Sequence, residues 1–353
     1  MNDGRGAKQP PLRAGDWVEV RSKEEILKTL DKDGQIDGMP FMPEMFQYCG
    51  KRLQVVKSAH KTCDTISGAW EGRRLTDSVH LDSIRCDGKA HGGCEAACLL
   101  FWKDAWLKPA DTASRPAAPL AEAPPMAGAC SEERVMAATR APASTDGQPV
   151  RYVCQATELL RASTPLPWWD LRQYVDDYRS GNATLRRMAQ GAVYSASANL
   201  VRALKNRPRI QSAVIKTYDS AQAIRGGVQF PRKHGAIPSG QKTPAVALNL
   251  QPGELVRVKS YEEILTTLDE DNENRGMTFD AEQVPFCGGT YRVRSRVNRI
   301  VNEKNGRMVE LKTPAILLEG VTCQACYSSK RMFCPRAVFP YWREIWLERA
   351  TQA

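Results

Sequence analysis

Cysteine and histidine are concentrated in one short stretch of the first third of the chain. From Cys86 to Cys98 the sequence reads CDGKAHGGCEAAC, which holds three thiols and the imidazole of His91. Near the C-terminus, Cys323 and Cys326 form a C-x-x-C pair that is followed by Cys334. Thiolate and imidazole bind zinc readily, and a C-x-x-C spacing lets two thiolates hold one ion from a tight turn. Both stretches therefore predict metal sites.

An internal repeat relates the two stretches. Residues 15–31 (GDWVEVRSKEEILKTLD) and 253–269 (GELVRVKSYEEILTTLD) are identical at eleven of seventeen positions, with an offset of 238 residues. The match continues to Cys49 and Cys287, which are therefore equivalent. Self-similarity at a fixed offset is typical of a repeated structural unit. We therefore predict a duplicated domain.

The repeat gives each copy three equivalent cysteines, one ligand short of a closed tetrahedral site. Cys86 and Cys94 in the first copy correspond to Cys323 and Cys334 in the second, where Cys326 can complete the set. The first copy has a surplus of candidates for its fourth ligand. The predicted metal ligands of the whole chain are Cys49, His60, Cys63, Cys86, His91, Cys94, Cys98, Cys287, Cys323, Cys326 and Cys334.

Zinc is the predicted metal, because it accepts thiolate and imidazole together and stabilises a small domain through a closed site. An iron–sulfur cluster is the alternative, although the C-x7-C-x3-C spacing matches no standard cluster or finger. The surplus of donors also allows an open catalytic position in the first copy. A cysteine nucleophile is less favoured, because His60 and Cys63 are three residues apart and would point to opposite faces of a strand. Cys49 and Cys287 can also be interpreted as small buried apolar residues.

Each copy is predicted to be β-rich, with one helix near its start. Ser22 and Ser260 each precede a glutamate by three residues, the spacing of a capping box that begins a helix. Residues 290–301 alternate between apolar and basic side chains, and Asn305-Gly306 then predicts a tight hairpin. Short strands, a hairpin and an entry helix are typical of small SH3-like barrels. The predicted fold class is α+β.

The chain divides into five predicted segments. Residues 1–14 form a flexible tail, and residues 15–108 form the first copy. An Ala- and Pro-rich stretch, residues 109–150, is expected to be a disordered linker. A helical and loop connector spans residues 151–248, and the second copy spans residues 249–353. The linker and the connector therefore join the two copies.

Two helices are predicted in the connector, broken at residues 180–182. The second, about residues 183–205, has apolar side chains at helical spacing and a polar face that is basic through residues such as Arg186 and Arg202. Such a helix can lie on a membrane or bind another protein, and it can also simply pack on one of the repeats. We predict a protein partner that is bound through these central helices.

The formal net charge of +10 and the isoelectric point near 9.1 favour acidic partners. Arg292, Arg294 and Arg296 lie on one side of the predicted strand and could contact nucleic-acid phosphates, although a solvated strand face explains them equally. The sequence has no apolar region typical of a secretory signal and no apolar run of eighteen residues, so we expect a cytoplasmic protein with reduced thiols.

Nucleotide-driven and common hydrolase functions lack support. The sequence has no P-loop, dinucleotide fingerprint, H-E-x-x-H or G-x-S-x-G motif. The phrases GDWVEVRSKEEIL, HGGCEAACLLFWKDAWL, FCGGTYRV and FCPRAVFPYWREIWL resemble a family of uncharacterised bacterial proteins with no known activity, over roughly two-thirds of the chain. This resemblance implies a bacterial cytoplasmic protein and assigns no chemistry.

The function predicted from the sequence is that of a metal-binding duplicated β-domain protein, acting as a binding or accessory module. One alternative is a metalloenzyme, or an iron–sulfur or cysteine-dependent enzyme, with its centre in the first copy. A nucleic-acid-binding protein is the second alternative.

Overall fold

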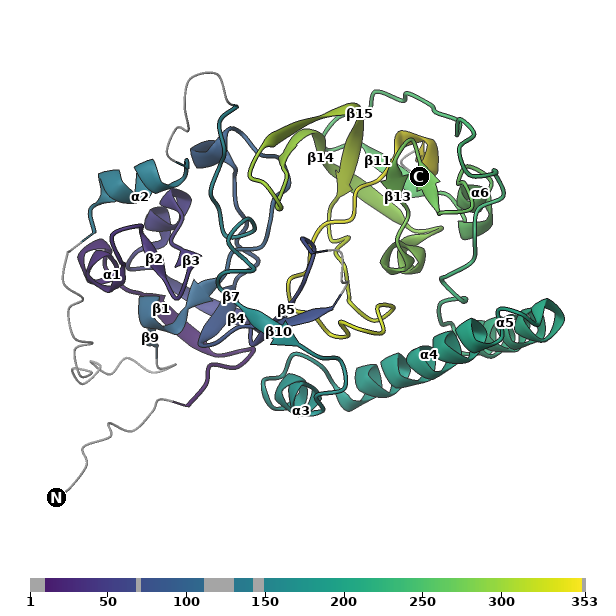
Figure 1. Cartoon of the computed structure of the whole chain (residues 1–353), viewed down its shortest axis with the longest axis horizontal. Coiled ribbons are helices and arrows are strands. Elements are labelled where there is room, and N and C mark those ends of the chain that lie inside the picture. Colours follow the sequence, from purple (N-terminus) through teal and green to yellow (C-terminus); the bar gives the residue numbers. More distant parts are fainter. Residues whose placement is uncertain (1–9, 68–70, 111–129, 142–148, 351–353) are drawn as a thin grey trace.

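The computed structural model of the chain describes residues 10–67, 71–110, 130–141 and 149–350 (Figure 1). Two β-containing halves lie side by side, the first formed by the N-terminal part of the chain and the second by its C-terminal part. Helices of the central segment run beneath them in this view. The architecture is mixed α+β, as predicted.

The first half contains a five-stranded antiparallel sheet. Its strand β1 (Trp17–Val20) lies between β4 (Arg52–Ser58) and β9 (Leu107–Pro109). Two further strands, β7 (Ser78–Leu81) and β8 (Trp102–Lys103), extend it to the order β8-β7-β4-β1-β9.

The second half contains a four-stranded antiparallel sheet of order β15-β14-β11-β16. Its strand β11 (Leu255–Val258) lies between β14 (Thr290–Val301) and β16 (Leu347–Arg349). Strand β15 (Met308–Leu318) pairs with β14 in the long hairpin predicted from the Asn-Gly pair. Gly306 in the turn has φ = +71°, a conformation that glycine adopts at little cost.

The same succession of short elements follows the first strand of each sheet. Both capping boxes are confirmed, at Ser22 before α1 (Lys23–Thr29) and at Ser260 before α6 (Tyr261–Leu265). A two-stranded ribbon and a 3-10 helix come next: β2 (Gln35–Ile36), β3 (Met39–Pro40) and η1 (Pro43–Tyr48) in the first half; β12 (Glu273–Asn274), β13 (Met277–Thr278) and η4 (Ala281–Phe286) in the second. A late 3-10 helix precedes the last strand of each half: η3 (Asp104–Trp106) and η5 (Glu344–Trp346).

Each half has its own hydrophobic core. Trp102 and Trp106 are fully buried in the first core, and Trp342 and Trp346 in the second. These four tryptophans therefore belong to the two cores. Burying a large aromatic side chain is among the strongest contributions to core stability.

The β-rich character of both halves is confirmed, whereas barrel closure stays a prediction. In the described residues each main sheet ends in two different edge strands, β8 and β9 in the first half and β15 and β16 in the second. An SH3-like barrel needs these edges to meet.

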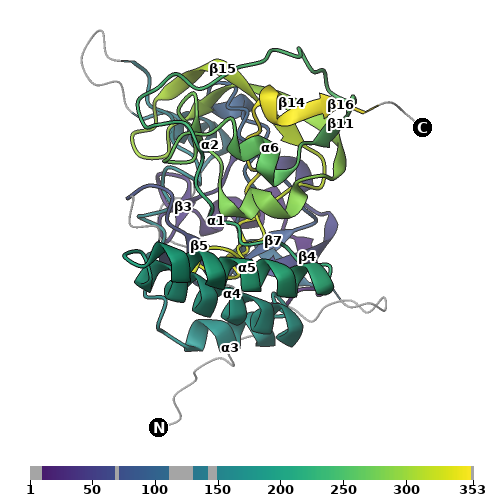
Figure 2. The same cartoon turned by 90° about the vertical axis from the view of Figure 1, so that its right-hand side faces the viewer.

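The central segment is attached to both halves. Strand β10 (Thr164–Leu166) joins β6 (Gly72–Arg74) and β5 (Lys61–Cys63) in a three-stranded sheet of the first half. Helix α3 (Arg172–Arg179) ends before the predicted break, and α4 (Leu185–Ala203) follows it. Figure 2 shows these helices stacked below the sheets.

Two helices differ from the sequence predictions. Helix α5 (Pro208–Ile224) was not among the two helices predicted in the connector. Its proline occupies the first turn, where a missing N–H costs nothing. Helix α2 (Glu132–Ala138) lies within the expected disordered linker, so that prediction is wrong for residues 130–141. Val135 is buried in the first core and holds α2 there. Residues 111–129 and 142–148 of the linker, and residues 1–9 of the tail, lie outside the described residues.

Candidate metal centre

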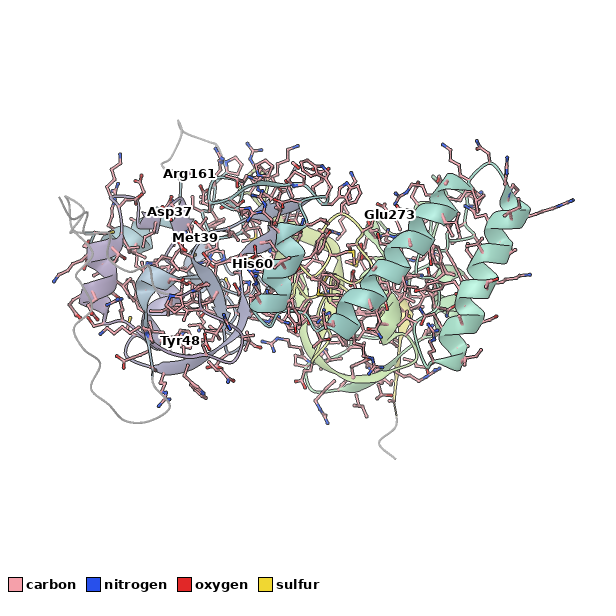
Figure 3. All side chains as sticks on the ribbon, turned by 90° about the horizontal axis from the view of Figure 1, so that it is seen from below. Asp37, Met39, Tyr48, His60, Arg161 and Glu273 are labelled. Carbon is pink, nitrogen blue, oxygen red and sulfur yellow. The ribbon has the colours of Figure 1, made fainter. Side chains whose placement is uncertain are left out.

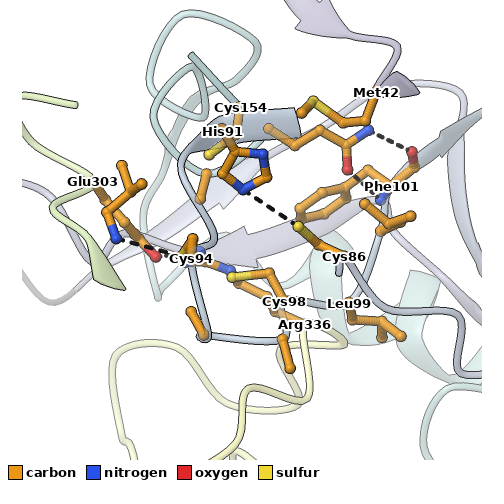
Figure 4. A pocket seen from close by; sticks show the side chains of 16 residues that line it. Met42, Cys86, His91, Cys94, Cys98, Leu99, Phe101, Cys154, Glu303 and Arg336 are labelled. Carbon is orange, nitrogen blue, oxygen red and sulfur yellow. Dashed lines mark hydrogen bonds and ion pairs between the residues drawn. The ribbon is translucent and has the colours of Figure 1, made fainter. Parts of the chain in front are cut away.

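A carboxylate, a thiol and an imidazole converge beside the first core. The donor atoms of Glu44, Cys86 and His91 all lie within 4.8 Å of one another. The Sγ atom of Cys86 is 3.4 Å from Nε2 of His91 (Figure 4). The sequence predicted the thiol and the imidazole as ligands, and the structure brings these two together. Oxygen, sulfur and nitrogen donors of these kinds all bind zinc, and three protein ligands leave the fourth tetrahedral position free.

Two glycines turn the chain so that the imidazole returns toward the thiol of Cys86. The short helix η2 (Lys89–His91) is bounded by Gly88 and Gly92, whose φ angles are +70° and +77°. Residues other than glycine rarely adopt this left-handed backbone conformation. A Cβ atom at Gly88 would also lie only 1.9 Å from the carbonyl oxygen of Cys94. The loop therefore depends on glycine at this position.

Burial disfavours the charged forms of all three donors. It raises the pKa of Glu44 and of Cys86, with the carboxylate adding to the effect on the thiol, and it lowers the pKa of His91. By hydrogen-bond geometry neither carboxylate oxygen of Glu44 has a partner among the described residues, and only the backbone N–H of Glu44 itself and the Cys86 thiol, a weak donor, act to lower its pKa against the effect of burial. Nδ1 of His91 also has no partner. Buried polar groups normally have partners, and a divalent cation held by the carboxylate, the thiolate and Nε2 of His91 would satisfy Glu44 and reverse the electrostatic cost of burying its charge.

A cavity of about 30 Å³ adjoins this group (Figure 4). Its lining includes Cys94, Cys98 and Cys154 of the first half and central segment, and Glu303 and Arg336 of the second half. The volume corresponds to that of about one water molecule. The space beside the donors therefore suits a small ligand such as water and is too small for an organic substrate.

The equivalent carboxylate of the second half is satisfied by the protein itself. Glu282, 238 residues after Glu44, is only 3% exposed. It accepts hydrogen bonds from the backbone N–H groups of Cys326 (3.2 Å) and Tyr327 (2.5 Å), and from the hydroxyl of Ser328 (3.3 Å). Hydrogen bonds to an ionised acceptor are stronger than neutral ones. This carboxylate needs no cation.

The thiol of the second half keeps the equivalent neighbour. Burial raises the pKa of Cys323 well above its usual value, and the Glu282 carboxylate adds to this effect. The thiol of Cys326 contacts Arg187 of α4, whose Nε lies 3.4 Å from it. The two thiols of the C-x-x-C pair therefore have different neighbours: Cys323 lies near the Glu282 carboxylate, and Cys326 contacts Arg187 of α4.

A second cysteine contact joins the two halves. The thiols of Cys63 in β5 and Cys334 form a hydrogen bond. This bond, together with the guanidinium of Arg336, lowers the pKa of Cys63 to about 6, while the pKa of Cys334 is raised. The shared proton thus stays on Cys334. The sequence did not predict this pair, because its members come from different copies and non-equivalent positions.

The other predicted ligands lie in different surroundings. Cys94 accepts a hydrogen bond from the backbone N–H of Val301 at 3.3 Å, and burial raises the pKa of Cys98 to about 12. Cys49 and Cys287 pack against the two cores, as their interpretation as apolar residues expects. Among the described residues, no other set of three potential ligands has its donor atoms as close as the set around Cys86.

His60 belongs to a buried ionic cluster. Its Nε2 lies 3.2 Å from one carboxylate oxygen of Asp177 in α3, and Lys61 Nζ lies 2.5 Å from the other. Burial lowers the pKa of Lys61, and the Asp177 carboxylate partly offsets this lowering. This cluster attaches α3 to the first half, and it uses His60 for structure.

The arginines of β14 bind within the protein. Arg292 donates to the carbonyl of Gly253 at 2.8 Å, and Arg296 forms an ion pair of 2.6 Å with Glu344. Arg294 lies over the ring of Phe339, 5.2 Å from its centroid. A role in phosphate binding stays a prediction without added support.

Glu44 was the ligand that sequence reasoning missed. A single carboxylate in an apolar segment gave no metal signal beside so many cysteines. The repeat offered one clue, because Glu44 and Glu282 are equivalent acids in otherwise apolar surroundings. Their shared position signals a buried carboxylate, yet only the three-dimensional surroundings distinguish the unpaired one from the paired one.

Comparison with known proteins yields no assignment. No protein-family model, no curated protein and no solved structure matches this chain. The resemblance to a bacterial family therefore stays a prediction. No helix in the described residues is both long enough and apolar enough to cross a membrane.

Proposed function

We propose that the protein is a zinc-binding accessory module whose metal centre is formed by Glu44, Cys86 and His91 of the first half. The observation that carries this proposal is the Glu44 carboxylate, whose oxygens have no hydrogen-bond partner by geometry among the described residues and which lies beside the Cys86 thiol and the His91 imidazole. A divalent cation bound by all three supplies the missing interactions.

The mixed donor set supports zinc over an iron–sulfur cluster. Zinc sites combine sulfur, nitrogen and carboxylate oxygen ligands, whereas clusters are held mainly by cysteine thiolates. In the described residues the close group contains only one thiol, Cys86. The fourth position is then taken by a water molecule in the adjoining cavity, or by Cys98 after a small movement of its side chain.

The cavity volume supports a stabilising centre over a catalytic one. About 30 Å³ admits a water molecule but no organic substrate. Zinc here would fix the loop from Cys86 to Cys98, which packs on the hairpin of the second half through Cys94. The metal would thus stabilise the contact between the two halves.

We further propose that the two halves are copies of one ancestral unit. The eleven identities in residues 15–31 and 253–269 and the matching succession of strand, helix, ribbon and 3-10 helix support this proposal. In the same proposal the module is a bacterial cytoplasmic protein whose central helices bind a partner.

Metal analysis of the purified chain tests the centre. Protein purified without chelator and oxygen is expected to hold about one zinc ion per chain, since one group of three ligands is present. Cys86→Ser and His91→Asn are each expected to lose the zinc. Cys49→Ser is the matched control, because this predicted ligand lies outside the group, and it should retain zinc. Iron in place of zinc, or loss of metal in the Cys49 variant alone, would contradict the proposal.

A further inference from the structure

Helix α3 exposes its apolar side chains and buries its polar ones. Gln173 and Asp177 are buried, and Asp177 is 0% exposed. On the opposite face Leu171, Val175 and Tyr178 are exposed, Leu171 to 71%. A surface helix normally has the reverse arrangement.

The cause lies in the first half of the protein. Lys61 is buried and contacts both polar side chains of α3, at 2.5 Å from Asp177 and 3.3 Å from Gln173. Because a buried cation requires a close anion, the polar face of α3 must point inward. Its apolar face is therefore left to solvent.

The apolar surface continues onto the next two helices. Helix α4 buries Tyr194 and Val201 against the second half, and on the opposite face it exposes Leu185, Val193 and Leu200. Figure 3, seen from below, shows the helices of the central segment facing the viewer. Of the fifteen large apolar side chains that are exposed among the described residues, ten lie between residues 168 and 224: Trp168, Trp169, Leu171, Val175, Tyr178, Leu185, Val193, Leu200, Ile210 and Ile224.

Positive charge is concentrated in the same segment. Residues 168–225, which include these ten apolar side chains, contain ten lysines and arginines and four aspartates, so the segment has a net charge of +6 where the whole chain has +10. One of these aspartates, Asp177, is buried against Lys61 and offers no charge to a partner. An anionic surface with an apolar interior complements this combination of cations and apolar side chains.

We propose that the α3–α5 surface binds the headgroup region of an anionic phospholipid bilayer, with Trp168 and Trp169 as interfacial anchors. Tryptophan and tyrosine are the side chains that favour this region of a bilayer, and arginine favours its anionic headgroups. A second copy of the chain is a poorer occupant, because it would bring another net charge of +6 against the same surface. This proposal rests on the role proposed above for the central helices and names their partner as an anionic bilayer. It does not depend on the metal centre.

Cosedimentation with vesicles tests the proposal. The full chain is incubated with vesicles of phosphatidylcholine alone, or of phosphatidylcholine with phosphatidylglycerol. We expect binding only to the anionic vesicles, with an affinity that falls as salt rises. The double variant Trp169→Ser/Leu171→Ser and the double variant Arg179→Gln/Arg186→Gln should each weaken binding by about tenfold or more. These side chains are exposed, so both variants should melt as the wild type does.

Met136→Ser is the matched control, because Met136 is also exposed, at 50%, but lies on α2, which Figure 1 shows on the opposite side of the first half from α3. It should bind as the wild type does. Absence of binding to anionic vesicles at low salt would overturn the proposal. So would binding that the Trp169/Leu171 variant retains in full, since that outcome assigns it to charge alone. Self-association or protein binding that the same variant abolishes, without vesicle binding, would assign the surface to a protein. A chain without zinc that still binds vesicles would separate this proposal from the metal centre.

Discussion

Substitutions of the two equivalent glutamates should differ in how their effects on stability depend on zinc. Glu44→Gln and Glu282→Gln remove the same charge at equivalent positions of the two halves. Glu282 accepts three hydrogen bonds from the protein, whereas Glu44 accepts none from a described nitrogen or oxygen donor. The first substitution should therefore affect metal binding, and the second should affect the fold.

The expected magnitudes follow from these contacts. Weakening the hydrogen bonds to an ionised acceptor costs about 1.5 to 3 kcal/mol, so Glu282→Gln should lower the unfolding free energy by that amount with or without zinc. Without metal, Glu44→Gln should not lower it, because burial raises the pKa of this carboxyl, as it does for Glu282, and Glu44 has no comparable set of three hydrogen bonds to lose. At free zinc one hundred times the dissociation constant, the wild type gains about 2.7 kcal/mol. If the substitution weakens binding a hundredfold, this gain falls to about 0.4 kcal/mol.

Urea unfolding with and without zinc measures both effects. Each protein is stripped with chelator, and its unfolding free energy is determined before and after zinc is restored. Competition with a zinc indicator gives the affinity of the native chain separately. The reasoning is refuted if Glu44→Gln destabilises the metal-free chain as much as Glu282→Gln does, or if it gains as much from zinc as the wild type.

Three further predictions concern polar side chains that make contacts within the fold. Asp177→Ala leaves Lys61 buried without its anion and should cost roughly 3 to 5 kcal/mol of unfolding free energy in urea, whereas Asp176→Ala, the less buried neighbour, should cost about 0.5 kcal/mol or less. His80 is fully buried, and burial lowers its pKa from 6.5 to about 4. The contribution of neutral His80 to the unfolding free energy is therefore complete above pH 6.5 and is lost as pH falls toward 4, a loss of about 3 kcal/mol. His80→Asn keeps a donor for the Leu100 carbonyl and should remove this pH dependence of unfolding. Glu95 accepts from the backbone N–H groups of Asn298 (2.5 Å) and Arg299 (3.2 Å), so Glu95→Ala should cost about 1 to 3 kcal/mol and speed hydrogen exchange at these two amides; unchanged exchange would show that the hairpin does not need this contact.

Local sequence signals predicted the elements well. A capping box needs only four residues, so Ser22 and Ser260 marked helix starts that the structure confirms. Alternation and an Asn-Gly pair similarly predicted the hairpin of β14 and β15. Such features depend on neighbours in the chain, and a sequence contains that information directly.

Contacts between distant segments were harder to predict. Helix α2 is held by the burial of Val135, a single apolar side chain in a polar and Ala-rich surrounding, which gives no strong periodicity. The outward apolar face of α3 depends on Lys61, more than one hundred residues earlier. From the sequence alone, apolar residues at helical spacing predict a buried face, and here a buried cation reverses that rule.

The candidate centre was predicted in part for the same reason. Cys86 and His91 are five residues apart and could be paired from the sequence, whereas Glu44 reaches them only through the fold. Residue type alone also predicted more cysteine ligands than the group of Glu44, Cys86 and His91 contains. Burial in a core and contact with another thiol are alternative surroundings for a cysteine, and no spacing rule distinguishes them from metal binding.

The comparison of the two halves changes the expected metal stoichiometry. Cysteine counts predicted one metal for each copy. Both halves keep a buried glutamate beside a cysteine, Glu44 with Cys86 and Glu282 with Cys323. In the second half, the backbone N–H groups of residues 326 and 327 donate hydrogen bonds to the Glu282 carboxylate and stabilise its charged form. A cation there would have to displace these hydrogen bonds, while in the first half it would displace none. We therefore expect one metal ion per chain, in the first half, and two tightly bound ions would contradict the distinction drawn between these two carboxylates.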